Sequence, residues 1–160
     1  MSSSVHFALQ LADPRGRCDR TDFIWASITL VAAQLAFALG LWVTNAGYMG
    51  WRGLVANVVF VWLGYAAISK RLHDLGRSAW WLLGAMLGWL VGAGALATAI
   101  VVAAGPSAIE PGAAGYLATF ALMMLPPLVL AVWLHVAEGE PVDNRYGPVP
   151  AGGFCDLQPA

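Results

Sequence analysis

The chain has 160 residues, of which 59% are hydrophobic and only 11% are charged, and its formal net charge is −1. A soluble domain carries roughly 25% charged residues, so these few charges cannot cover a water-facing surface, and lipid must solvate much of the protein. The near-zero charge also argues against bulk attraction to nucleic acid. We therefore expect a small membrane protein in which one helical bundle accounts for the whole length.

The N-terminal tail, residues 1–22, is polar and ends in a basic stretch that holds Arg15, Arg17 and Arg20. Arg17 and Arg20 are three residues apart, so they share a face if this stretch is helical. The apolar run that follows, residues 23–44, contains no charged residue and is longer than the roughly 7–15 residues of a signal-peptide core. We therefore predict that this run is retained as the first transmembrane helix.

The first predicted span is long enough to cross a bilayer, because a helix rises roughly 1.5 Å per residue and the hydrocarbon core is about 30 Å thick. Small residues recur at every fourth position in this span, at Ala32, Ala36 and Gly40. Such a stripe lets another helix approach closely in lipid. The second predicted span, residues 53–69, follows after a short turn.

A charged island, residues 70–78, separates the second span from the third and holds three of the eight Lys and Arg residues of the chain. Its sequence is Lys70-Arg71-Leu72-His73-Asp74-Leu75-Gly76-Arg77-Ser78. Because apolar runs flank the island on both sides, we predict a short loop that reverses the chain at a membrane face.

The third predicted span, residues 79–104, contains two overlapping G-x-x-x-G steps made by Gly84, Gly88 and Gly92. Glycines at this spacing favour close helix packing in lipid. We expect them to pack against the small-residue stripe of the first span within the same chain. A seam between two copies of the chain is the alternative.

The fourth predicted span, residues 113–137, contains Pro126 and Pro127. A proline inside a helix removes a backbone hydrogen bond, so we expect a kink there. Residues 138–160 form a polar C-terminal tail with four prolines.

The basic residues are distributed unevenly over the predicted tails and loops. The N-terminal tail and the charged island hold three each and the C-terminal tail holds one, whereas the first loop holds only Arg52 and the third loop holds none. Because Lys and Arg favour the cytoplasmic side, this bias predicts that both tails are cytoplasmic. We therefore expect an all-α membrane protein, a bundle of four transmembrane helices with N-in/C-in topology.

This topology brings three polar segments of the chain to one face of the bundle. The candidate ligand or lipid-headgroup residues on that face are Arg17, Arg20, Arg71, His73, Asp74, Arg77, Ser78, Asn144 and Arg145. In one interpretation, Asp74 and Asp22 pair with arginines and hold the loops together. In the other, surplus guanidinium groups bind a phosphate or an anionic lipid headgroup, which the forked donors of arginine suit. The two interpretations are compatible.

Two other functions remain open. A membrane-embedded enzyme would use His73 and Asp74 as acid and base on a lipid or phosphorylated substrate, but adjacent helical residues point about 100° apart and cannot bond as base and orienter. A small transporter or channel subunit would usually carry a charged residue inside a span, and none is present in the predicted spans. No spacing typical of a metal site occurs, and nothing implies a cofactor.

We therefore favour a non-enzymatic membrane protein. Its expected partners are membrane lipids and, beyond these, a partner protein or a second copy of the chain, with no role for nucleic acid.

Three motifs point to a known family. They are Gly16-Arg17-x-x-Arg20-x-x-Phe23-x-Trp25, then Arg71-Leu72-His73-Asp74-Leu75-Gly76-Arg77-Ser78-x-Trp80-Trp81, then Asn144-Arg145-Tyr146-Gly147. Together they resemble the bacterial inner-membrane family catalogued as domain of unknown function 805, over about residues 13–148. The family usually has Gly where this chain has Ala79. The resemblance implies a bacterial inner-membrane location and assigns no biochemical activity.

Overall fold

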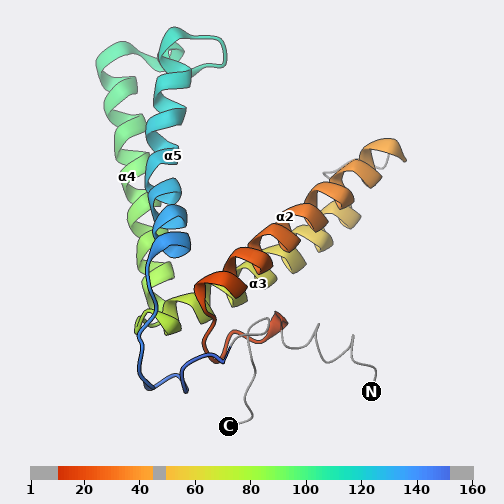
Figure 1. Ribbon diagram of the computed structural model, residues 1–160. Helices are drawn as coiled ribbons and strands as arrows, with labels where there is room; N and C mark the ends of the chain where they lie inside the picture. The colour runs from red at the N-terminus through yellow and green to blue at the C-terminus, as the bar shows by residue number, and fades with distance from the viewer. Residues whose placement is uncertain (1–10, 45–49, 152–160) are drawn as a thin grey trace. The chain divides into compact units, whose positions relative to one another are not determined.

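The computed structural model describes residues 11–44 and 50–151. At Ala114 and Ala118 it describes the backbone alone. Four long helices dominate these residues (Figure 1). They are α2 (Arg20–Val43), α3 (Trp51–Asp74), α4 (Trp80–Ala104) and α5 (Ala114–Val136), with a short 3₁₀ helix, η1 (Pro106–Ile109), between the last two. Each long helix is long and apolar enough to cross a membrane. The described residues form no strand, so the predicted all-α class with four membrane-length helices is confirmed.

The charged island differs from the prediction, because its first five residues are helical rather than a loop. Helix α3 continues through Asp74, and Gly76, which follows the C-cap residue Leu75, has a positive φ of 68°. The amide of Gly76 donates to the carbonyl of His73 at 3.1 Å, and the amide of Arg77 donates to the carbonyl of Leu72 at 2.8 Å. These two bonds define a glycine-terminated helix end in which the last carbonyls are satisfied. The non-helical connection between α3 and α4 therefore comprises only residues 75–79.

The described chain divides into two compact units. The first contains α2 and α3, which lie side by side (Figure 1), together with residues 11–19 and 135–151. Helix α2 begins where the Asp19 side chain accepts a hydrogen bond from the amide of Asp22 at 2.6 Å, which caps its first turn.

Most of the buried apolar residues described in this unit lie at the end where α2 begins and α3 finishes. They are Cys18, Phe23, Ala26, Ala66, Ala67 and Leu72, whereas Leu41 is buried near the other end of α2. Alanine at the contact lets two helix backbones approach closely, and the Phe23 ring also packs on the ring of His135, with 4.8 Å between the ring centroids.

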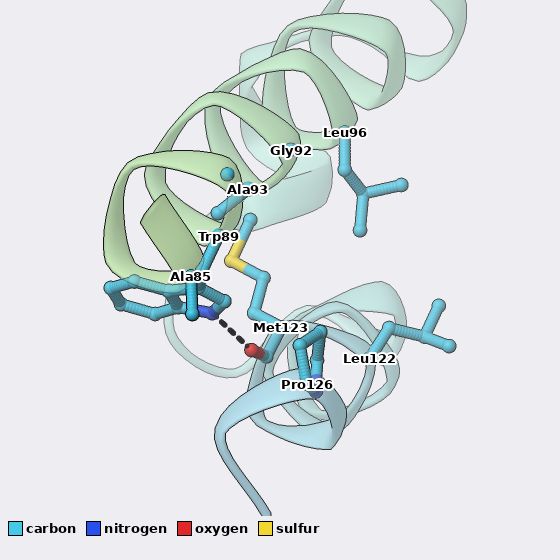
Figure 2. A pocket seen from close by; sticks show the side chains of 9 residues that line it. Ala85, Trp89, Gly92, Ala93, Leu96, Leu122, Met123 and Pro126 are labelled. Carbon is cyan, nitrogen blue, oxygen red and sulfur yellow. Dashed lines mark hydrogen bonds between the residues drawn. The ribbon is translucent and has the colours of Figure 1, made fainter. Parts of the chain in front are cut away.

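The second unit contains α4 and most of α5, which run side by side in Figure 1. A polar contact joins them: the indole N–H of Trp89 donates to the carbonyl of Met123 at 2.6 Å (Figure 2). That carbonyl lies four residues before Pro127, which has no N–H to give it. The indole therefore satisfies an acceptor that the proline leaves open, and the helix continues through both prolines.

Gly88 and Gly92 of α4 line part of a groove of about 350 Å³ beside this contact. A Cβ atom added at Gly84, Gly88 or Gly92 would meet no heavy atom within 4 Å. On α2, Ala32, Ala36 and Gly40 are exposed. Packing of the glycines against that stripe, or against a second copy, stays a prediction.

Candidate functional site

Asp74, the last residue of α3, receives two guanidinium groups. Its Oδ1 accepts from Nε and Nη2 of Arg17 at 3.1 and 3.0 Å, and its Oδ2 accepts from Nη1 of Arg71 at 2.6 Å. All three residues are buried, with relative exposures of 3% for Arg17, 0% for Arg71 and 3% for Asp74. Arg71 and Asp74 lie three residues apart on one helix face, whereas Arg17 reaches them from the N-terminal tail. We call these three residues the Asp74 cluster.

Arg17 uses every donor it has. Besides its two bonds to Asp74, Nη2 donates to the carbonyl of Glu140 at 2.6 Å, and Nη1 donates to the carbonyls of Val142 at 2.8 Å and Gly147 at 3.4 Å. A guanidinium carries five N–H groups in a rigid fork, so all five are satisfied. One side chain thus joins the N-terminal tail, the end of α3 and the C-terminal tail.

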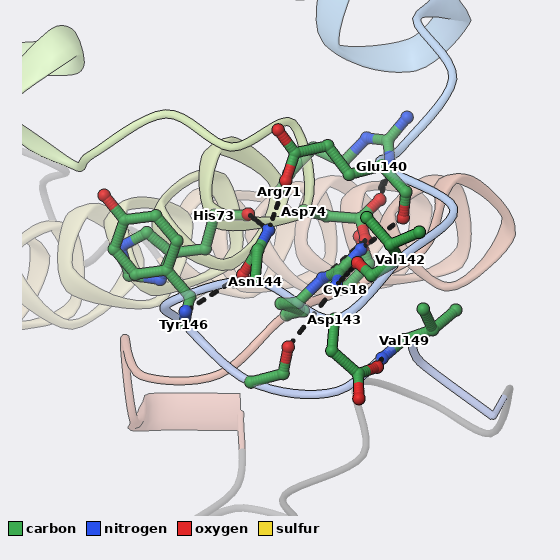
Figure 3. A network of polar contacts seen from close by, with 12 residues as sticks. Cys18, Arg71, His73, Asp74, Glu140, Val142, Asp143, Asn144, Tyr146 and Val149 are labelled. Carbon is green, nitrogen blue, oxygen red and sulfur yellow. Dashed lines mark hydrogen bonds and ion pairs between the residues drawn. The ribbon is translucent and has the colours of Figure 1, made fainter.

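The segment of the C-terminal tail that crosses the Asp74 cluster, residues 137–147, is called the strap here. Figure 3 shows Glu140, Val142 and Asn144 of the strap gathered around Asp74. The amide of Glu140 donates to the carbonyl of Asp74 at 2.8 Å, and the Asn144 side chain donates to the carbonyl of His73 at 3.0 Å. Nη2 of Arg71 donates to the carbonyl of Ala137. The strap therefore lies on the last turn of α3.

Two glycines allow the strap to lie this close. A Cβ atom at Gly139 would overlap the carboxylate of Asp74, and a Cβ atom at Gly76 would overlap the carboxylate of Glu140. A larger residue at Gly139 would displace the strap from α3, because two arginines hold the Asp74 carboxylate in place, whereas at Gly76 the Glu140 side chain could move aside.

His73 is used for packing beside the cluster. Its Nδ1 lies 3.0 Å from the carbonyl of Gly16. Its ring stacks on the ring of Tyr146 at 4.0 Å between centroids and 8° between planes, an arrangement that favours aromatic pairs when the rings are offset. The guanidinium of Arg145 lies 4.7 Å from the same tyrosine ring.

The remaining candidates lie outside the Asp74 cluster. Arg20 is exposed at the first position of α2, Arg77 is exposed just after the end of α3, and Arg145 is exposed on the strap. Ser78 is half-buried two residues before α4. The structure thus brings Arg17, Arg71, His73, Asp74 and Asn144 into one contact network and leaves three of the other arginines exposed; what any of them binds stays a prediction.

The sequence interpretation missed several members of the network. The strap takes part mainly through main-chain carbonyls. Every residue has one, so the residue type does not indicate which of them accept hydrogen bonds. Lys70 is 1% exposed, and its carbonyl accepts from the amide of Cys18 at 3.3 Å. The Ser69 hydroxyl donates to the carbonyl of Pro14 at 3.1 Å. One feature of the sequence could have revealed them. Gly76 is typical of a helix end, and a helix that ends there would include residues 69–74.

The arrangement suits a structural junction better than acid–base chemistry. Both carboxylate oxygens of Asp74 accept from guanidinium groups, so this side chain is engaged in two buried ion pairs. Among the described residues, no group of three or more His, Cys, Asp or Glu side chains is placed to hold a metal ion.

Comparison with known proteins finds one matching family and two similar proteins. The family described as "Protein of unknown function (DUF805)" matches residues 11–148. Two relatives, each named "Inner membrane protein YhaH", come from Escherichia coli strain K12 and Escherichia coli O157:H7. Each is 36% identical over 85 residues, which cover 48% of this chain and 69% of the relative. No solved structure matches the chain.

An inner-membrane relative and four helices of membrane length give the same location, a bacterial inner membrane, for this protein. The match spans nearly all of the described residues and includes the three segments that meet at Asp74. The chain belongs to the DUF805 family of proteins of unknown function.

Proposed function

We propose that this protein is a non-enzymatic inner-membrane protein that binds the headgroups of anionic lipids on its cytoplasmic face. The observation that carries the proposal is the division of the five candidate arginines into two sets. Arg17 and Arg71 are buried on Asp74, whereas Arg20, Arg77 and Arg145 are exposed. We call the second set the exposed arginines.

The Asp74 cluster holds the exposed arginines near one end of the first unit. Arg20 lies three residues after Arg17, Arg77 lies three residues after Asp74, and Arg145 belongs to the strap. Each basic side chain near an anionic leaflet contributes about 1 kcal/mol to attraction. Three of them on segments that meet at one cluster therefore favour a phosphate-bearing headgroup.

The excess of Lys and Arg on the tails and the charged island supports a cytoplasmic position for this face. The contacts of Arg17 with Asp74 and with the strap support the same topology, because they require the two tails to lie on one side of the membrane. A partner protein with an acidic surface is the second candidate for the exposed arginines. No observation favours the transporter alternative.

Co-purification of lipid tests the proposal. The triple variant Arg20→Gln, Arg77→Gln, Arg145→Gln is purified in mild detergent beside the wild type, and the bound phosphatidylglycerol is counted by native mass spectrometry. Arg52→Gln is the matched control, because Arg52 is also an exposed arginine but lies at the start of α3, at the other end of that helix from Asp74. We expect the triple variant to lose most of its phosphatidylglycerol and the control to keep it. Equal retention in all three proteins would refute the proposal.

A further inference from the structure

The strap is fastened to the protein by guanidinium–carbonyl bonds rather than by buried apolar side chains. Arg17 donates to three of its carbonyls and Arg71 to a fourth. The strap side chain of Val142 is 63% exposed, and residues 141, 143 and 145 are exposed as well. Displacing the strap would therefore expose little aliphatic surface. Its main cost would be the loss of these hydrogen bonds, of the Glu140 and Asn144 bonds to α3, and of the stacking of Tyr146 on His73.

The donors that the strap occupies are of the kind that binds anions. Arg17 binds Asp74 through Nε and one N–H of Nη2, so its other three N–H groups point at the carbonyls of Glu140, Val142 and Gly147. Peptide carbonyls are neutral acceptors. A phosphate oxygen accepts from guanidinium in shorter and roughly twice as strong bonds, and the arginine fork fits phosphate in bidentate fashion.

We propose that the strap covers a latent anion site formed by Arg17 and Arg71, and that its displacement opens this site to a phosphate group. The phosphate belongs either to a lipid headgroup or to a small soluble phosphate compound. This site is separate from the exposed arginines, so the proposal does not rest on the lipid binding argued above.

Gly139 offers a way to open the strap without changing any charged residue. In Gly139→Val the new side chain would overlap the carboxylate of Asp74, which two arginines hold in place. Pro141→Val is the matched control, because it places the same side chain two residues further on at an exposed position. Opening is measured as faster trypsin cleavage after Arg145. A second opened form lacks residues 137–160 altogether, so that it removes the carbonyl that Arg71 holds as well as those that Arg17 holds.

Binding is measured with each protein in nanodiscs. In the first arm, inorganic phosphate is titrated into protein in phosphatidylcholine nanodiscs and followed by calorimetry. In the second arm, phosphatidylglycerol is mixed into the nanodiscs and the lipid retained by the protein is counted by native mass spectrometry. A gain in the first arm identifies soluble phosphate as the ligand source, and a gain in the second arm alone identifies a lipid headgroup.

We expect the opened forms to bind phosphate in one of these arms about tenfold or more tightly than the wild type, since a site open one-tenth of the time or less loses that factor in apparent affinity. Pro141→Val should behave as the wild type. The gain should persist when Arg20→Gln and Arg77→Gln are added, because those residues belong to the exposed arginines. If the two opened forms gain nothing in either arm, or if the gain vanishes with those two substitutions, the latent site does not exist.

Discussion

The end of α3 buries charged side chains, whereas α4 exposes apolar side chains along its whole length. At the end of α3 the buried side chains include Lys70, Arg71 and Asp74, whereas no residue of α4 is buried and Val102 is 81% exposed. A water-soluble domain shows the reverse arrangement. The comparison indicates that lipid solvates α4, and that the first unit is held at one end by hydrogen bonds and ion pairs.

The two regions should therefore respond differently to substitution. Substitutions within the Asp74 cluster should loosen the contacts of the two tails and leave the α4–α5 pair intact. A substitution at the contact between α4 and α5 should leave the strap intact. The predictions that follow test this separation, beginning with the largest effect.

Asp74→Ala should have the largest effect, with a loss of about 3–5 kcal/mol in the free energy of unfolding. The reason is that two buried guanidinium groups would lose the carboxylate that they share. Thermal unfolding of the purified protein in detergent measures the loss. Glu110→Ala is the control, because Glu110 is an exposed carboxylate after η1 in the other unit. Similar unfolding temperatures for the two variants would contradict the role given to Asp74.

Arg17→Lys should cost about 2 kcal/mol, because lysine keeps the charge but has no planar fork for Asp74 and three carbonyls. Hydrogen exchange of residues 137–147 should become about tenfold faster or more, whereas exchange in α4 and α5 should not change. Arg15→Lys, at an exposed neighbouring position, is the control. Unchanged exchange in the strap would show that the contacts of Arg17 do not hold it.

Trp89→Phe should have the smallest effect, about 0.5–1.5 kcal/mol, because it removes one hydrogen bond to the carbonyl of Met123 and keeps the aromatic ring. Exchange should rise in α5 near Met123 and stay unchanged in the strap. Trp80→Phe, an exposed indole at the start of the same helix, is compared as a further Trp-to-Phe change. Faster hydrogen exchange of the strap in Trp89→Phe would mean that the two regions are coupled.

The sequence predicted the helices well, because each apolar run is long and free of charge. It also predicted that Arg17, Asp74 and Asn144 would come together, because the distribution of Lys and Arg favours a topology with both tails on one side. The N-in/C-in orientation itself stays a prediction.

Other features of the site were out of reach of the sequence or were misjudged. Residues 70–74 were assigned to a loop on account of their charge, although Gly76 indicates a helix end just after them. The sequence did not separate the buried arginines from the exposed ones, because both sets have the same chemistry. The strap binds through carbonyls of residues such as Val142, and the residue type does not indicate that a main-chain carbonyl accepts a hydrogen bond.

A double-mutant cycle between Arg17 and Asp74 tests the central claim most directly, namely that a buried ion pair ties the N-terminal tail to the end of α3. The unfolding free energies of Arg17→Gln, Asp74→Asn and the double variant are compared with that of the wild type. We predict a coupling free energy of about 2–3 kcal/mol, as expected for residues in one hydrogen-bonded network. Effects of the two substitutions that add to within about 0.5 kcal/mol would show that the side chains do not interact.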